Sequence, residues 1–334
     1  MRCSVNLLGA LALVLSGPLW AACPTADLLA RLARMSKLPQ QVVAAQLADD
    51  ALLGPYARGH FADTVHQPSR VGSSHQRQLD EQWLGLITPD IEKRASRARQ
   101  AARFDDDGLH LKGQSWGPAS LSGLNLQQRL ALKDGDNATL EHLLWQQALV
   151  TLAPNWLKEA GWPEEKIACS KALVENSLDR VWLMQRLGVS TDPHHPSPAL
   201  DALAKAVSSD DIAAYYQAHQ GDFRQLAAVD ARLFEADSAA NINHRQPEIT
   251  HLTRQEAQGQ VLKTLAFVTP ELGRSAVIRL PSGRYGQVEV LKRHYQQLAP
   301  DSESVAFVAR QAIAKAQAKA NWQALLVKLR QEAQ

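Results

Sequence analysis

The sequence predicts an α+β protein with three parts: a mainly helical N-terminal module, a small domain built on an antiparallel sheet, and one long C-terminal helix. Apolar residues recur at helical spacing through most of residues 25–206. Apolar and polar residues alternate over 229–233, and two strand-like runs, 276–280 and 286–291, flank a Pro-Ser-Gly-Arg turn. Residues 302–331 form an Ala-rich helical run.

Composition excludes several classes of protein. The chain has 334 residues, of which 45% are hydrophobic and 21% charged, so it is not wholly disordered. Its 36 Lys and Arg residues nearly balance 34 Asp and Glu residues, which does not favour an electrostatic nucleic-acid binder. The sequence contains no CxxC motif and no Cys/His cluster, and we expect neither a metal nor a cofactor.

The N-terminus is typical of an export signal. Arg2 precedes an apolar run at 7–15, and Ser16-Gly17-Pro18 breaks this run before small residues. The run is too short to span the roughly 30 Å hydrocarbon core of a bilayer permanently. We therefore expect residues 1–21 to be a signal peptide, and the mature protein, starting near Ala22, to be periplasmic or otherwise exported, with no stable membrane span.

The cysteines leave alternatives open. Once the signal is removed, Cys23 and Cys169 remain, and an oxidising compartment favours a disulfide between them. The segment before Cys23 is also similar to the end of a bacterial lipoprotein signal, although Trp20 stands where that motif has a smaller aliphatic residue. A lipid anchor at Cys23, and two unpaired thiols, are the other interpretations.

Helices are predicted throughout the N-terminal module. Thr25 and Asp27 are start signals for a helix that continues beyond Pro39 in a second apolar run. A polar loop is expected at 64–78, and separate helices around 83–87 and at 91–103, the latter ended by an acidic turn. The strongest helical run is 138–187, interrupted at Gly161-Trp162-Pro163. These helices form a predicted domain at 22–207, which closes in a Pro-rich linker.

The second predicted domain covers 208–298 and mixes helices with strands. Ser208 is an N-cap signal for a short helix, the alternating run at 229–233 predicts a half-buried strand, and a helix is expected at 253–267. The turn at 281–284 predicts a hairpin. Residues 299–334 should form a helix that packs on the N-terminal module through an apolar stripe. The stripe consists of Val305, Val308, Ala312, Trp322, Leu325, Leu326 and Leu329.

Residues 172–332 resemble the SurA/PpiC class of exported folding factors, in which a helical chaperone module carries a parvulin-type peptidyl-prolyl isomerase domain. Residues 172–188 are similar to the helix before the isomerase domain, and residues 211–225 to its entry helix, which leads into the first strand at 229–233. Residues 271–273 are similar to the end of a Gly-rich turn of that family, and 280–289 to its closing hairpin.

This resemblance implies a chaperone-like module, a parvulin-like domain and binding of unfolded or Pro-containing polypeptides. It also implies a catalytic role for His294 and a substrate groove near Leu233, Phe267, Tyr285 and Tyr295. The chain departs from the pattern at one strand position, where Leu233 replaces a histidine, and it lacks the double-glycine turn. Two hypotheses follow: a weak parvulin-type isomerase, and a non-catalytic chaperone or scaffold subunit of an envelope assembly. His251 is expected to be a surface or turn residue.

Overall fold

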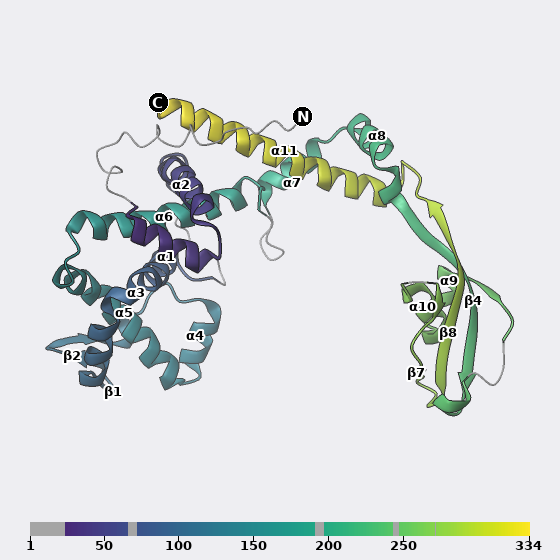
Figure 1. Cartoon of the computed structure of the whole chain (residues 1–334), viewed down its shortest axis with the longest axis horizontal. Helices are drawn as coiled ribbons and strands as arrows, with labels where there is room; N and C mark the ends of the chain where they lie inside the picture. The colour runs from purple at the N-terminus through teal and green to yellow at the C-terminus, as the bar shows by residue number, and fades with distance from the viewer. Residues whose placement is uncertain (1–23, 66–71, 191–196, 243–246, 271) are drawn as a thin grey trace, which may run out of the picture. The chain divides into compact units, whose positions relative to one another are not determined.

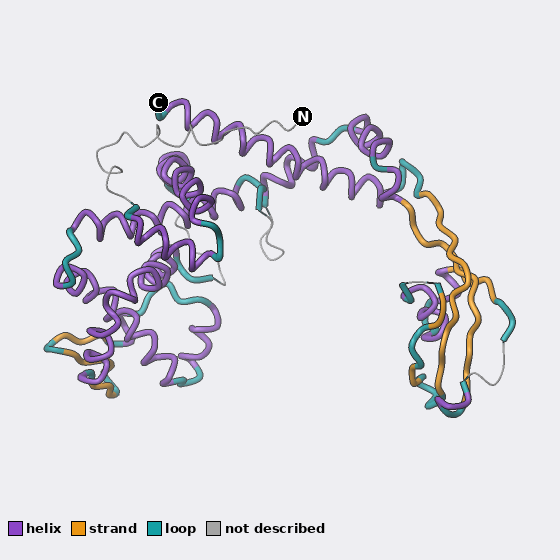
Figure 2. The backbone as a smooth tube through the Cα atoms, viewed as in Figure 1, coloured by secondary structure: helices purple, strands orange, loops and turns teal. Residues whose placement is uncertain are grey.

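Figure 1 shows the computed structural model, in which all residues are described except 1–23, 66–71, 191–196, 243–246 and 271. Helices predominate and two small antiparallel sheets complete the structure, which confirms the α+β class (Figure 2). Residues up to Leu200, together with Ala318–Gln334, make up one compact unit, and Asp201–Gln317 make up a second. Below they are called unit 1 and unit 2.

Within its described residues, unit 1 contains six complete helices, a small sheet and the C-terminal part of the last helix. The helices are α1 (Ala26–Ser36), α2 (Gln40–His60), α3 (His75–Ala101), α4 (Leu126–Lys133), α5 (Asn137–Glu159) and α6 (Glu164–Arg186). The sheet consists of β1 (Arg103–Asp105), β2 (Gly108–Leu111) and β3 (Gln114–Trp116), and a short 3-10 helix, η1 (Pro118–Ser120), follows it. Thr25 and Ser74 cap α1 and α3 by accepting backbone N–H donors through their hydroxyl groups.

Helix α3 corrects two predictions. The expected loop at 64–78 ends earlier, because Ser74 caps a helix that begins at His75, and the two predicted helices are one that continues through Pro89. A proline inside a helix removes one backbone hydrogen bond. Here the neighbouring side chains Ile87 and Ile91 are buried in the core on either side of it, and this packing holds the helix together.

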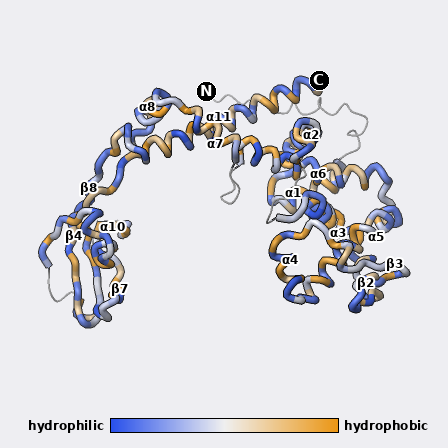
Figure 3. Tube along the Cα trace, turned by 180° about the vertical axis from the view of Figure 1, so that it is seen from behind, coloured by the Kyte–Doolittle hydropathy of each residue, from blue (hydrophilic) through white to orange (hydrophobic). Residues whose placement is uncertain are grey.

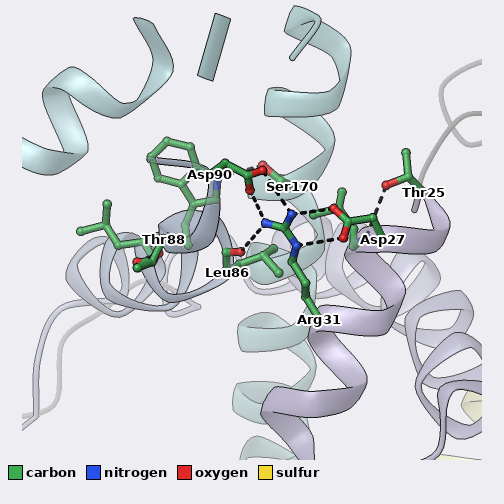
Figure 4. Close-up of polar contacts among 10 residues, drawn as sticks. Thr25, Asp27, Arg31, Leu86, Thr88, Asp90 and Ser170 are labelled. Carbon is green, nitrogen blue, oxygen red and sulfur yellow. Dashed lines mark hydrogen bonds and ion pairs between the residues drawn. The ribbon is translucent and has the colours of Figure 1, made fainter. Parts of the chain in front are cut away.

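The core of unit 1 is centred on α3, α5 and α6. Trp83 is 1% exposed, and its indole N–H donates to the Ser170 hydroxyl over 2.8 Å, while Ser170 donates to the Ile167 carbonyl. Figure 4 shows a second link, in which Arg31 of α1 is ion-paired with Asp27 and with Asp90 of α3. Apolar packing and these polar contacts together hold α1 and α6 against α3.

Helices α2 and α6 are joined by buried ion pairs. Asp179 is fully buried and pairs with Arg58 and with His75, whose Nε2 lies 3.1 Å from an Asp179 oxygen. In a second pair between these helices, the buried Asp50 lies 2.5 Å from the Nε atom of Arg180, which follows Asp179. Burial raises the pKa of Asp50 to about 7, which outweighs the opposite effect of Arg180.

The raised pKa of Asp50 predicts a pH-dependent stability. The folded-state pKa of Asp50, about 7, lies above the ordinary value of 3.8. Between pH 3.8 and about 7, Asp50 is therefore protonated in the folded protein but has lost its proton in the unfolded chain. The contribution of Asp50 is fully present below pH 4 and is lost as the pH rises through 7. Relative to Asp50→Asn, the unfolding free energy of the wild type should fall by about 2–4 kcal/mol from pH 4.5 to 8. Urea unfolding at several pH values measures this difference, and a flat or rising difference contradicts it.

The last helix, α11 (Glu303–Glu332), contributes to both cores. In unit 1, Trp322 and Leu326 pack with Leu53 and Leu183, and Arg330 lies 2.6 Å from Asp49. In unit 2, Val305 packs with Tyr216 and Phe223. Apolar and polar residues alternate along this helix (Figure 3). Val308, expected in the apolar stripe, is 48% exposed.

Unit 2 is built on an antiparallel sheet in the order β5-β4-β8-β6, with β7 also paired to β8. Its strands are β4 (Arg224–Ala236), β5 (Thr250–Thr253), β6 (Gly273–Arg274), β7 (Ile278–Arg279) and β8 (Tyr285–Gln297). Its helices before α11 are α7 (Pro198–Ala206, from Asp201 onward), α8 (Ser209–Ala218), η2 (Gln220–Phe223), η3 (Ala239–Asn241), α9 (Arg254–Ala257) and α10 (Val261–Val268). None of the described helices is both long and apolar enough to cross a membrane.

The sheet differs from its prediction in extent. The strands β4 and β8 are longer than the runs 229–233 and 286–291, because they pair with each other along most of their length. The expected helix at 253–267 is divided into α9 and α10 around Gly259, whose φ of 73° is a left-handed conformation that a helix interior does not allow. Helix α10 packs on the apolar face of the sheet, against Val229, Val288 and Val290.

A histidine–aspartate–histidine cluster on unit 2

The strand β4 places Asp230 on the sheet face opposite α10. Successive side chains of a strand point to opposite faces. Val229 and Ala231 are fully buried in the core beneath α10, so Asp230 between them points to the other face. Asp230 lies in the middle of β4, a long central strand, so the strand alternation sets the direction of its side chain.

The neighbouring strands each bring one histidine to Asp230. In the antiparallel register, Asp230 pairs with His251 of β5, whereas His294 of β8 pairs with Ala228, two residues before Asp230 on the same face. Residues directly opposite and diagonally opposite on one face lie within reach of each other's side chains. Three adjacent strands therefore place two imidazoles and a carboxylate together.

Both imidazoles contact the same carboxylate group. His251 Nδ1 lies 2.6 Å from Asp230 Oδ1, and His294 Nε2 lies 2.8 Å from Asp230 Oδ2. The two rings lie edge to face with their centroids 5.1 Å apart. The side chains of Asp230, His251 and His294 are 25%, 58% and 33% exposed, so the cluster is open to solvent.

The hydrogen bonds to the histidines hold Asp230 in its ionised form. Those from His251 and then His294 lower the pKa of Asp230 below its ordinary value. At neutral pH the carboxylate therefore accepts from a ring N–H on either side. Such an array can bind a cation, orient a polar group or exchange protons.

Several other charged groups on this part of the sheet are paired with one another. Arg232, which follows Asp230 on the same face, lies 3.0 Å from Glu289, and Arg274 lies 3.4 Å from Glu289. The guanidinium of Arg274 also lies over the ring of Phe234. The ion pairs lower the pKa of Glu289, principally through its hydrogen bond with Arg232. The strand register places Lys292 of β8 opposite Asp230, whose side-chain hydrogen bonds run to His251 and His294.

The structure brings only Leu233 and Phe267 of the predicted groove residues into one cluster. Leu233 and Phe267 pack with the core on the α10 side of the sheet, whereas His294 is on the opposite side with Asp230. Tyr285 begins β8, nine residues from His294, which is about 30 Å along an extended strand. Tyr295 is 48% exposed and its ring lies near the Arg224 guanidinium.

Sequence reasoning missed Asp230 and His251. The sequence predicts Asp230 only as the polar member of an alternating strand. It predicts His251 as a surface or turn residue, and His251 is indeed 58% exposed, but it gives no role in a site. The sequence feature that could have pointed to Asp230 is a charged residue between two apolar residues of a predicted strand. The partner of the strand could not be read from the sequence, because β5 is separated from β4 by 13 residues that carry no periodicity.

A groove lies elsewhere on unit 2, where α10 meets β6. It has a volume of about 380 Å³ and is lined by Leu265, Val268, Thr269, Pro270, Leu272, Arg274, Ser275 and Ala276. Val268 is 65% exposed and Leu272 is 63% exposed, values that are high for large apolar side chains. The strand β6 forms an edge of the described sheet beside this groove.

One of the two cysteines of the predicted disulfide lies among the described residues. Cys169, in α6, is disulfide-bonded. Its predicted partner, Cys23, lies outside the described residues, so the pairing and the alternative lipid anchor at Cys23 stay predictions.

Comparisons with known proteins give one match. The sequence matches no protein-family model and no curated protein. Among solved structures, a chain described with the virulence factor PEB4 and the periplasmic protein Cj1289, two SurA-like chaperones of Campylobacter jejuni, is 17% identical. The match covers 74% of this chain and 84% of that chain, with a TM-score of 0.20. A likeness this low does not transfer fold or function.

Proposed function

We propose that the protein is an exported, non-catalytic folding factor that binds unfolded or Pro-containing polypeptides through the groove between α10 and β6. The observation that carries the proposal is the pair of exposed apolar side chains, Val268 and Leu272, that both line this groove. Covering exposed apolar side chains with a partner removes them from water, which is favourable. Exposed apolar residues that line one groove therefore indicate a binding site.

The groove suits an extended polypeptide. The edge strand β6 carries backbone groups along one rim, and an extended chain can hydrogen-bond to such an edge while alternate side chains enter apolar pockets. Proline is compatible with this mode, because its ring buries apolar surface and its missing N–H is not required at every position. Ser275 and Thr269 also line the groove, and their hydroxyl groups donate to the backbone carbonyls of Ala276 and Leu265.

The placement of Leu233 favours binding over isomerisation. In the resembled family a histidine on the first strand works with a second histidine on the last strand. In this chain Leu233 packs into the core under α10, and His294 lies on the other face. A histidine at position 233 would therefore not reach His294. The isomerase hypothesis keeps one supporting observation, the hydrogen bond between His294 and Asp230, and it remains the second candidate.

The proposal includes export of the protein from the cytoplasm. The signal-like residues 1–21 support a periplasmic or otherwise exported location, and they lie outside the described residues. A role as a scaffold subunit of an envelope assembly shares the binding surface and differs in the partner, which would be a folded subunit and not an unfolded chain.

A peptide-binding measurement tests the groove. We expect the double variant Val268→Ser/Leu272→Ser to bind a fluorescein-labelled, unfolded, Pro-containing peptide about 10- to 100-fold more weakly than the wild type, because each side chain loses part of the roughly 1.5–3 kcal/mol of apolar burial. Fluorescence anisotropy measures the change. The matched control is Phe307→Ser/Val327→Ser, which removes apolar residues of similar exposure from α11.

Equal loss in both double variants would place binding outside the groove. The same preparations, assayed on a short X-Pro peptide, distinguish the isomerase hypothesis. We expect no acceleration of the cis–trans exchange. Acceleration by the wild type that disappears in His294→Ala would overturn the non-catalytic assignment.

A further inference from the structure

We propose that Asp230, His251 and His294 form a binding site for a divalent transition-metal ion, for which Zn²⁺ is the probe. One ligand atom of each residue lies within 4.8 Å of the other two. This inference concerns the sheet face opposite α10 and does not depend on the proposed polypeptide binding. It also departs from the expectation, drawn from the cysteine pattern alone, that the protein holds no metal.

The spacing of the three groups is close to that of a metal site. Bonds from Zn²⁺ to imidazole nitrogen and carboxylate oxygen are about 2.0–2.2 Å, so ligand atoms around a tetrahedral ion lie roughly 3.3–3.5 Å apart. The two contacts of Asp230, 2.6 and 2.8 Å, are shorter than this. These contacts join the two histidines to different oxygens of the carboxylate. Inserting the ion therefore requires one carboxylate oxygen to turn toward it and the three ligand atoms, which lie within 4.8 Å of one another, to shift by roughly 1 Å.

The donor set selects the kind of ion. Two imidazole nitrogens and one carboxylate oxygen suit Zn²⁺, Cu²⁺, Ni²⁺ and Fe²⁺, whereas Ca²⁺ and Mg²⁺ prefer sites made entirely of oxygen. The carboxylate also supplies a negative charge, and the guanidinium of Arg232, which follows it on the same face, is paired with Glu289. Three protein ligands leave at least one coordination position for water or for a ligand atom of another molecule.

The sheet holds the ligands in place. The central strand β4 is hydrogen-bonded to both β5 and β8, so the backbone positions of all three residues are set before any ion arrives. His251 is 58% exposed, which gives an ion access from solvent. A bound ion would link three strands and stabilise unit 2, since it binds the folded sheet and not the unfolded chain.

Titration of the full mature chain with Zn²⁺, after treatment with a chelator, tests this site. We expect one tight Zn²⁺ per chain by calorimetry. His251→Gln, His294→Gln and Asp230→Asn should each weaken binding at least ~10-fold, since even outer groups of metal sites contribute 10- to 100-fold. The matched control is His110→Gln. His110 makes a similar 2.9 Å contact with Asp105, but this pair is not part of the three-residue cluster of Asp230, His251 and His294.

A second measurement, made on the wild type, tests the site even if some of the variants fold poorly. In the wild type, Zn²⁺ should shift the NMR resonances of two histidine rings together, and these should be the two rings whose signals are missing in His251→Gln and His294→Gln. Zn²⁺ affinity that is unchanged in Asp230→Asn, equal loss in His110→Gln, or shifts confined to other histidines would each overturn the site.

Discussion

Replacing Trp83 with alanine is expected to lower the free energy of unfolding by about 3–5 kcal/mol, the range observed when a buried tryptophan is truncated. Trp83 is 1% exposed within the main core of unit 1. The variant leaves a cavity among α3, α5 and α6, and it also removes the donor to Ser170. Urea unfolding followed by far-UV circular dichroism measures the loss.

Ser170→Ala is the control that separates the hydrogen bond from the packing. It keeps the ring and removes its acceptor, which leaves a buried N–H without a partner at a cost of about 1–3 kcal/mol. A loss of less than 1 kcal/mol in Trp83→Ala would mean that the packing around this ring is not as described.

Trp322→Ala should destabilise unit 1 by about 3–5 kcal/mol as well, because the ring is 6% exposed and fills the space between α2 and α6. The effect is expected although Trp322 lies more than 130 residues beyond α6 in the sequence. Thermal unfolding by circular dichroism measures it.

The control for Trp322 is Val327→Ala on the same helix. Val327 is 50% exposed, and its truncation should change stability by no more than about 0.5 kcal/mol. Equal stability of the wild type and Trp322→Ala would contradict the packing of α11 on this unit. If residues 318–334 make the contacts described, deleting them should be at least as harmful as Trp322→Ala.

Much of the fold follows from local patterns. The apolar spacing of α5 and α6 and the caps at Thr25 and Ser208 identify helices, because helix formation depends on side chains three and four residues apart. The turn around Gly283 identifies the β7–β8 hairpin, since its φ of 86° needs glycine. The small sheet β1-β2-β3 was not predicted, because its strands have only three or four residues.

The candidate sites were predictable only in part. His294 was singled out through a family resemblance, and the structure places it in a hydrogen-bonded cluster. The groove residues Leu233, Phe267 and Tyr285 were assigned to one surface by the same resemblance, although the strand alternation already placed Leu233 with Val229 and Ala231. Periodicity was in this case the better guide, because it follows directly from strand geometry.

The sequence by itself determined the α+β class, most of the helices, the closing hairpin and the inward face of β4, since each depends on residues within about ten positions of one another. Only the tertiary structure decided that His251 lies beside Asp230, that Val268 and Leu272 border one groove, and that Trp322 packs against Leu53. These contacts depend on strand register and helix packing, which are settled by the burial of apolar surface over the whole chain and not by any local pattern.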